Sequence, residues 1–191
     1  MILKVQQKYK KCYESGFDIV DNKNNVIGSM KIVGSIGSME GKWTIIYREK
    51  VINLEKFYKS IFSQNKKLPN GKVVGRPYKI DLASNEVGYI YQEIRKTGLF
   101  STEYIPQLLY FNSTYVRYGI VKDDFFINMI YYLEKQIVEI EKSTTTINML
   151  YDYNVYAVDE KSALIGILFV AYQYTISGFN PGIKPIGPCK E

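Results

Sequence analysis

One segment near the C-terminus, residues 159–178, constrains the fold of this chain more than any other. Between positions 163 and 176 only Gly166, Gln173 and Thr175 interrupt a run of aliphatic and aromatic side chains, and these three do not form a polar face. A helix that is apolar on nearly every side must be buried in protein or in lipid. The run would extend only ~21 Å, whereas the hydrocarbon core of a bilayer is ~30 Å thick. We therefore expect a helix that is enclosed by its own protein.

Residues on both sides of this run predict where the helix begins and ends. Asp159 is suited to the N-cap position, and Glu160 places a negative charge in the first turn, where the helix dipole favours it. Gly178 is suited to the left-handed conformation after the last turn, and Pro181 prevents the helix from resuming. The predicted helix spans about residues 160–177.

Length and composition predict one mainly β domain. The 191 residues fit a single domain, and the 18 Tyr contribute to an aromatic content of 15%, which favours strands. We expect this domain to cover residues 1–178 and to be followed by a Pro- and Gly-rich tail at residues 179–191.

Short strands joined by polar turns are expected over most of the chain before the helix. Runs of alternating apolar residues flank an Asp-Asn-Lys-Asn-Asn turn at residues 21–25, which is the pattern of a hairpin. A second hairpin, beginning at Lys79, resembles the first, beginning at Ile19, so the chain contains an internal repeat. The matched pairs are Asp21 with Asp81, Asn25 with Asn85, Ile27 with Val87, and Gly28 with Gly88.

Two segments depart from this simple pattern. In residues 53–64 the apolar side chains recur at helical spacing after Asn53, which predicts a short amphipathic helix inserted between strands. Residues 125–142 fit either one helix or a hairpin of two β-branched strands around Leu133, and the periodicity alone leaves both open. The apolar residues of the first segment are Leu54, Phe57, Tyr58, Ile61 and Phe62.

Together these elements predict a closed antiparallel β-barrel around the C-terminal helix. A single domain can surround a helix that is apolar on every side by wrapping a sheet around it, and closure of the sheet also removes its edges. Many short strands in repeated hairpins, followed by one helix, fit this mainly β architecture.

The segments FDIVDNKNNVIG, from Phe17, and YNVYAVDEKSALIGILFVAYQYT, from Tyr153, resemble the tubby C-terminal-like superfamily. This superfamily includes tubby, the phospholipid scramblases and the LURP-one-related proteins. The resemblance covers roughly residues 2–178 and implies a β-barrel around a central hydrophobic C-terminal helix. It also favours the hairpin for residues 125–142. It implies non-catalytic work at membranes, although tubby's basic phosphoinositide-binding positions have no match in this chain.

The charge of the chain favours anionic partners. Net charge is +6 with a sequence pI of about 9.1. Only four of the 25 basic residues are Arg, the residue that binds phosphate and guanine through two hydrogen bonds, so we do not expect a nucleic-acid partner. The best local cluster surrounds the LPNGK turn, next to apolar residues of segment 53–64, and is the candidate site for anionic lipid. It consists of Lys66, Lys67, Lys72 and Arg76, and the alternative is a solvated turn. A second basic group, Lys8, Lys10 and Lys11, has no aromatic neighbour and is interpreted as a solvated strand end.

Catalytic sites find little support in the sequence. The absence of histidine excludes Ser-His-Asp, Cys-His and His-metal sites. The adjacent acids Asp123–Asp124 and Asp159–Glu160 are typical of turns and helix starts, and Gly34–Gly41 lacks the spacing of a phosphate-binding loop. We expect no enzymatic activity, no cofactor and no metal; a carboxylate- or Lys-dependent enzyme is the weakest of the alternatives.

Cysteine usage and the N-terminal sequence favour the cytoplasm. The first residues contain no apolar stretch typical of a signal peptide, and Cys12 and Cys189 lack metal-ligand spacing. We therefore expect two free thiols, with a disulfide between the two ends of the chain as the alternative. The leading hypothesis is therefore a cytoplasmic, non-catalytic binding domain, peripheral to a membrane when it binds anionic lipid. The alternative is a protein-interaction module that uses a Tyr-rich barrel surface.

Overall fold

The computed structural model describes residues 1–10, 14–34, 41–57, 65–99, 101–122, 125–144 and 150–177. Within these ranges the chain forms a 13-stranded antiparallel sheet and one α-helix. The strands are β1 (Ile2–Lys10), β2 (Glu14–Asp21), β3 (Val26–Val33), β4 (Lys42–Tyr47), β5 (Lys50–Lys56), β6 (Asn65–Lys67), β7 (Val73–Leu82), β8 (Asn85–Lys96), β9 (Thr102–Tyr110), β10 (Ser113–Lys122), β11 (Phe125–Tyr132), β12 (Lys135–Thr144) and β13 (Tyr151–Ala157); the helix is α1 (Glu160–Ser177).

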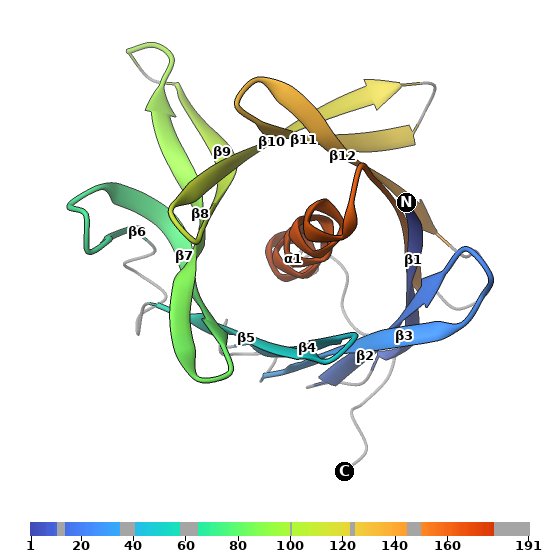
Figure 1. The fold of residues 1–191 in the computed structure, drawn as a ribbon. Helices are drawn as coiled ribbons and strands as arrows, with labels where there is room; N and C mark the ends of the chain where they lie inside the picture. The colour runs from blue at the N-terminus through green and yellow to red at the C-terminus, as the bar shows by residue number, and fades with distance from the viewer. Residues whose placement is uncertain are drawn as a thin grey trace, which may run out of the picture.

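The sheet closes into a barrel around α1, as predicted (Figure 1). Neighbouring strands follow the order β5-β4-β3-β2-β1-β13-β12-β11-β10-β9-β8-β7, and β5 pairs with β7 to complete the ring. β6 lies outside the ring and pairs only with the start of β7. In the barrel wall β1 lies between β2 and β13 and pairs with both. The first strand of the chain is therefore a direct neighbour of the last.

Helix α1 begins and packs as its sequence predicts. The backbone N–H of Ser162 donates to Asp159 Oδ1 at 2.7 Å, which confirms Asp159 as the N-cap. All side chains from residue 162 to residue 174 are buried. The two polar residues within the run are bonded to the barrel wall: Trp43 Nε1 donates to Thr175 Oγ1 at 2.8 Å, and Gln173 accepts from the wall as well.

Gly166 lets α1 approach the wall closely. A Cβ at this position would lie 2.7 Å from Val155 Cγ1 on β13 and 3.0 Å from Val138 Cγ1 on β12. These distances are shorter than carbon–carbon contact, so the helix and these two strands are as near as a glycine allows.

The predicted internal repeat is present as two bulged hairpins. Ile19 pairs with Gly28 and Ile80 pairs with Gly88, and each pairing is followed by a register shift toward the turn. A Cβ on Gly28 would lie 2.3 Å from the carbonyl oxygen of the next strand, and one on Gly88 would lie 1.9 Å from the equivalent oxygen. Glycine is therefore required by close approach of backbone.

A third copy of this hairpin, not predicted from the sequence, lies in β11–β12. Ile130 pairs with Val138, again followed by a register shift. In each copy the carbonyl before the bulge accepts from the next turn: Ile27 from Arg48 N, Val87 from Phe111 N, and Ile137 from Val158 N, at 2.9–3.1 Å. Val138 stands where the other two copies have glycine, and its side chain faces α1 at Gly166.

The structure decides the two irregular segments differently. The amphipathic helix predicted for residues 53–64 is wrong at its start, because residues up to Lys56 belong to strand β5; residues 58–64 lie outside the described part of the chain. Ile52 and Leu54 are buried in the barrel while Val51 is exposed, so period-two alternation prevails over helical spacing. Residues 125–142 form the hairpin β11–β12. Other residues discussed from the sequence also lie outside the described ranges: Cys12, Cys189, positions 35–40 of the Gly34–Gly41 segment, and Asp123–Asp124.

Candidate functional site

The predicted basic cluster surrounds a small extension on the outer wall of the barrel. β6 and the turn that follows it cover part of β8, where Leu68, Val74, Tyr89 and Tyr91 form a second buried apolar cluster. Phe57, beside the end of β5, contacts Tyr89 edge to face, with ring centroids 5.3 Å apart. This extension is therefore packed onto the barrel wall by its own apolar contacts.

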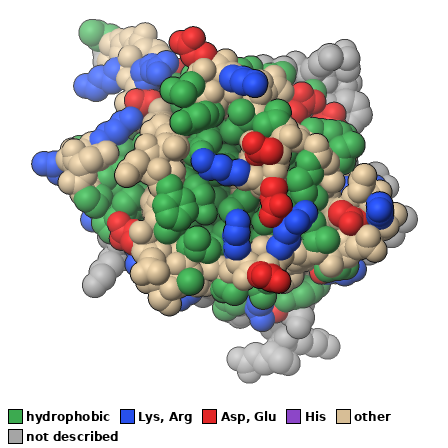
Figure 2. Space-filling model, in the orientation of Figure 1, with side chains coloured by type: hydrophobic (Ala, Val, Ile, Leu, Met, Phe, Trp, Pro, Cys, Tyr) green, Lys and Arg blue, Asp and Glu red, His purple; other side chains and the backbone are tan. Residues whose placement is uncertain are grey.

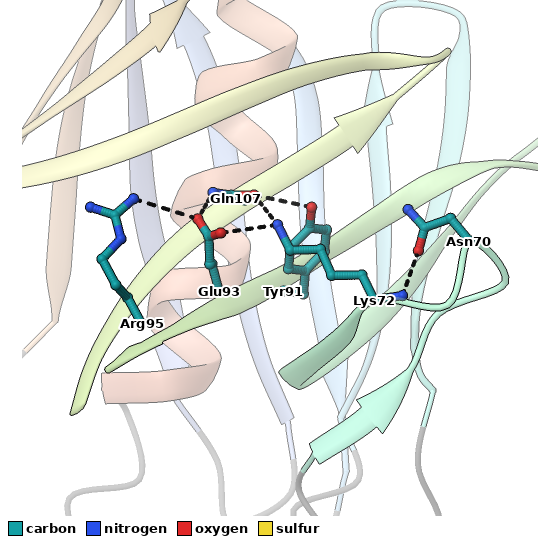
Figure 3. A network of polar contacts seen from close by, with 6 residues as sticks. All are labelled: Asn70, Lys72, Tyr91, Glu93, Arg95 and Gln107. Carbon is teal, nitrogen blue, oxygen red and sulfur yellow. Dashed lines mark hydrogen bonds and ion pairs between the residues drawn. The ribbon is translucent and has the colours of Figure 1, made fainter. Parts of the chain in front are cut away.

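A polar network borders this apolar cluster (Figure 3). Lys72 Nζ lies 3.1 Å from Glu93 Oε1, and Gln107 Nε2 donates to the other oxygen of Glu93. Tyr91 OH donates to Gln107 Oε1 at 3.1 Å, and burial, followed by the charge of Glu93, raises the pKa of Tyr91. Arg95 Nη2 approaches Glu93 at 3.9 Å. Through its contacts with Glu93 on β8 and Gln107 on β9, Lys72 attaches the turn between β6 and β7 to the barrel wall.

The structure does not assemble the four predicted residues into one cationic surface. Lys66 and Lys67 are adjacent in β6, so their side chains leave the strand on opposite faces. Lys72 is neutralised by Glu93. Arg76 has a left-handed φ of 45° at a bulge in β7, and its carbonyl accepts from Tyr172 OH at 3.0 Å. Of the second basic group, Lys8 pairs with Asp18 at 3.0 Å, and Lys11 lies outside the described residues.

A different surface stands out at the end of the barrel where α1 begins, which we call the turn end. Here the hairpin ends and the β13–α1 connection expose large apolar side chains to solvent. Leu133 is 80% exposed, Val26 63%, Val158 59% and Phe111 56%. Figure 2, which looks onto this end, shows hydrophobic side chains over much of the face, with charged side chains of both signs between them. We call these four residues the apolar tips.

Two of the apolar tips are in conformations that disfavour their residue type. Phe111 has φ 45° and is followed by Asn112 at 61°; Leu133 has φ 47° and is followed by Glu134 at 66°. Two successive left-handed residues are typical of the type I′ turn, for which Asn and Gly are preferred. Each bulky residue there costs about 1 kcal/mol or more. Leu133 is 80% exposed and gains little burial in return, so folding alone does not explain it. Phe111 recovers part of its cost through an edge-to-face contact with Tyr110, with ring centroids 4.7 Å apart, but more than half of its surface stays exposed.

Charges of both signs separate the apolar tips. Arg48 pairs with Glu160 across the rim at 3.2 Å, joining the β4–β5 turn to the first turn of α1. The other charged residues of the turns and adjoining strand ends include Lys23, Lys50, Lys135 and Lys161 and the acids Glu49, Glu86 and Glu134.

Sequence reasoning missed the apolar tips because it treated turns as polar connections. One signal was available: in Leu133-Glu134 an apolar residue occupies a two-residue turn between strands. Recognising it required the hairpin interpretation of residues 125–142, which periodicity left open.

Comparisons with known proteins add no constraint. No protein-family model, no curated protein and no solved structure matches this chain. Within the described ranges, no group of three or more acidic or cysteine side chains is arranged to hold a metal ion, and no helix combines the length and apolar character needed to cross a bilayer.

Proposed function

We propose that this barrel is a non-catalytic binding domain that docks on an anionic membrane surface through the apolar tips of its turn end. The observation that carries the proposal is the projection of Phe111 and Leu133 into solvent from strained turns. Burial of these side chains in the interfacial region of a bilayer would compensate for the exposure of apolar surface and for the unfavourable backbone conformation.

The arrangement of the tips favours lipid over a folded partner. They are single side chains at the ends of three separate hairpins and in the β13–α1 connection, with charged residues between them. Hot spots of protein interfaces instead cluster in a packed centre. The net charge of +6 supports the choice of an anionic surface, although the acids of the turn end reduce the local attraction. The resemblance to the tubby-like superfamily, with its membrane-associated members, points in the same direction.

The magnitude of the apolar contribution follows from side-chain burial. Complete burial of a Leu or Phe side chain stabilises by about 1.5–3 kcal/mol. Insertion to half that depth at Leu133 and Phe111 gives about 1.5–3 kcal/mol for the pair, roughly a 10- to 150-fold gain in affinity.

Co-sedimentation with vesicles tests the proposal. We expect binding to vesicles containing phosphatidylserine, weaker binding to neutral vesicles, and a decrease at physiological salt. The double variant Phe111→Asn with Leu133→Asn keeps a residue suited to the left-handed conformation and should lose binding by the factor given above. Val73→Asn with Leu99→Asn removes two exposed apolar side chains at the opposite end of the barrel without changing the charge, and serves as the matched control. Absence of binding at low salt, or equal binding by the tip variant, would refute the proposal.

A protein-interaction module is the second candidate, favoured by one observation on the barrel wall. Tyr118 is 46% exposed on β10, and its ring contacts Tyr131 on β11 with centroids 5.8 Å apart. Tyrosine pairs of this kind are common at interfaces. Binding that is lost in Tyr118→Ala and retained in the tip variant would favour this candidate.

A further inference from the structure

The inner wall of the barrel carries a polar group of residues beside the C-terminal half of α1. Arg117 on β10 faces inward, on the same side of its strand as the buried Tyr115. Its Nη1 donates to Gln173 Oε1 of α1 at 3.0 Å, and Asn128 Nδ2 on β11 donates to the same oxygen at 3.2 Å. Tyr153, on β13, is also buried inside the barrel. The three wall residues lie on β10, β11 and β13, which belong to the run of four neighbouring strands from β10 to β13.

Hydrogen bonding within this group is incomplete. Arg117 Nε, Asn128 Oδ1 and Tyr153 OH are buried and have no hydrogen-bond partner among the residues that the structure describes. Buried polar atoms are almost always paired in folded proteins, because leaving one unpaired costs about 1–3 kcal/mol. Three such atoms around one bonded cluster indicate that something else completes the bonding.

The charge of this group is also uncompensated. In the described part of the chain Arg117 has its hydrogen bond to Gln173 but no ion pair with a carboxylate. Burial lowers the pKa of Arg117 to about 10, so the guanidinium stays charged at neutral pH in surroundings that disfavour a lone charge. Lys142 on β12 lies directly opposite Tyr153 in the register, and its Nζ is 3.8 Å from the centre of the Tyr151 ring. A second cation therefore adjoins the group.

We infer that the barrel interior contains a binding site for a small oxyanion, a carboxylate or phosphate group, with Arg117 as its main ligand and Tyr153 OH as a further donor. Nη1 of Arg117 is occupied by Gln173, which leaves the edge formed by Nε and Nη2 for the ligand. That edge presents two parallel N–H donors and matches two oxygens of a carboxylate or phosphate. Asn128 Oδ1 can accept from a protonated phosphate oxygen or from a water molecule beside the anion.

Thermal unfolding in sodium acetate and in sodium phosphate, each matched to sodium chloride at equal ionic strength, tests this inference. At ten times its dissociation constant, a bound anion should raise the Tm by about 3–6 °C. Arg117→Gln should abolish this rise. Arg95→Gln, the same change on the outer wall, should retain it and so controls for general effects of the salt. The anion with the larger effect identifies the ligand as carboxylate or phosphate.

Two further results separate binding from a structural role. Without added anion, Arg117→Gln should unfold at the same temperature as the unmodified chain or higher, because it removes an uncompensated charge. Tyr153→Phe should fold normally, because its hydroxyl has no partner, and should weaken anion affinity about 3- to 10-fold by calorimetry. This second variant keeps the test available should Arg117→Gln fail to fold.

The inference is overturned if neither anion raises the Tm above the chloride control, which would leave ordered water as the occupant. It is equally overturned if Arg117→Gln, or Tyr153→Phe where that variant is used, responds to both anions as the unmodified chain does.

Discussion

Gly166→Ala is the substitution that most directly tests the packing of α1 inside the barrel. In an exposed helix, replacing Gly by Ala stabilises by about 1 kcal/mol through helix propensity. Here the new Cβ would lie 2.7 Å from Val155 Cγ1 and 3.0 Å from Val138 Cγ1. Both neighbours are β-branched, with little rotamer freedom, and belong to a closed wall. The helix cannot move away, because strands surround it on every side.

Whether Gly166→Ala raises or lowers the free energy of unfolding depends on the balance between the gain in helix propensity and the cost of overpacking. Overpacking of a dense core costs about 1–3 kcal/mol, and two contacts this short favour the upper part of that range. After subtracting the propensity gain, we expect Gly166→Ala to destabilise the protein by about 1–2 kcal/mol. Urea unfolding should therefore show a lower midpoint with an unchanged m-value.

A double-mutant cycle with Val155→Ala adds a sharper test. Val155→Ala alone should destabilise by leaving a cavity, but it also removes the nearest methyl group to position 166. The two changes should therefore be non-additive, with a coupling energy of about 1 kcal/mol or more in favour of the pair. Stabilisation by Gly166→Ala alone, or strict additivity, would show that the helix does not contact the wall as described.

Three further predictions concern other parts of the fold. Gly88→Ala should be more destabilising than Gly166→Ala, because its Cβ meets a backbone oxygen, that of Leu109, at 1.9 Å and no side chain can move aside; the urea midpoint checks this. Leu133→Asn should stabilise by up to about 1 kcal/mol in thermal unfolding, since Asn tolerates the left-handed conformation. Asp159→Ala should cost about 0.5–2 kcal/mol at neutral pH. Bonding to Ser162 lowers the pKa of Asp159, so this contribution is present above its unfolded pKa and lost as pH falls through the lower folded value; the two chains should converge in stability in acid.

The barrel could be predicted because one segment leaves few alternatives. The helix at residues 160–177 must be enclosed, and a chain of short strands has one way to enclose it. The repeat was visible as well, because Gly28 and Gly88 are required by the same close backbone contact. Its third copy was not visible, since Val138 stands where the other two have glycine.

The site was harder to predict than the fold because it depends on which strands become neighbours. Lys72 appeared available in the sequence, but the pairing of β7 with β8 brings Glu93 to it. The helix predicted for residues 53–64 is wrong at its start. Leu54 and Phe57 satisfy helical spacing, but residues up to Lys56 form β5, which pairs with both β4 and β7. Arg117 became notable only when its strand placed it inside the barrel.

The most direct test of membrane docking is to place a fluorescent reporter on an apolar tip. The single native tryptophan, Trp43, is fully buried inside the barrel, so it provides a constant background. In Phe111→Trp, anionic vesicles should shift the added emission to the blue, and lipids brominated on the acyl chain should quench it. Tyr118→Trp on the barrel wall is the matched control and should be unaffected. If the Phe111→Trp emission stays unchanged, or if only Tyr118→Trp is quenched, the turn end is not the membrane surface.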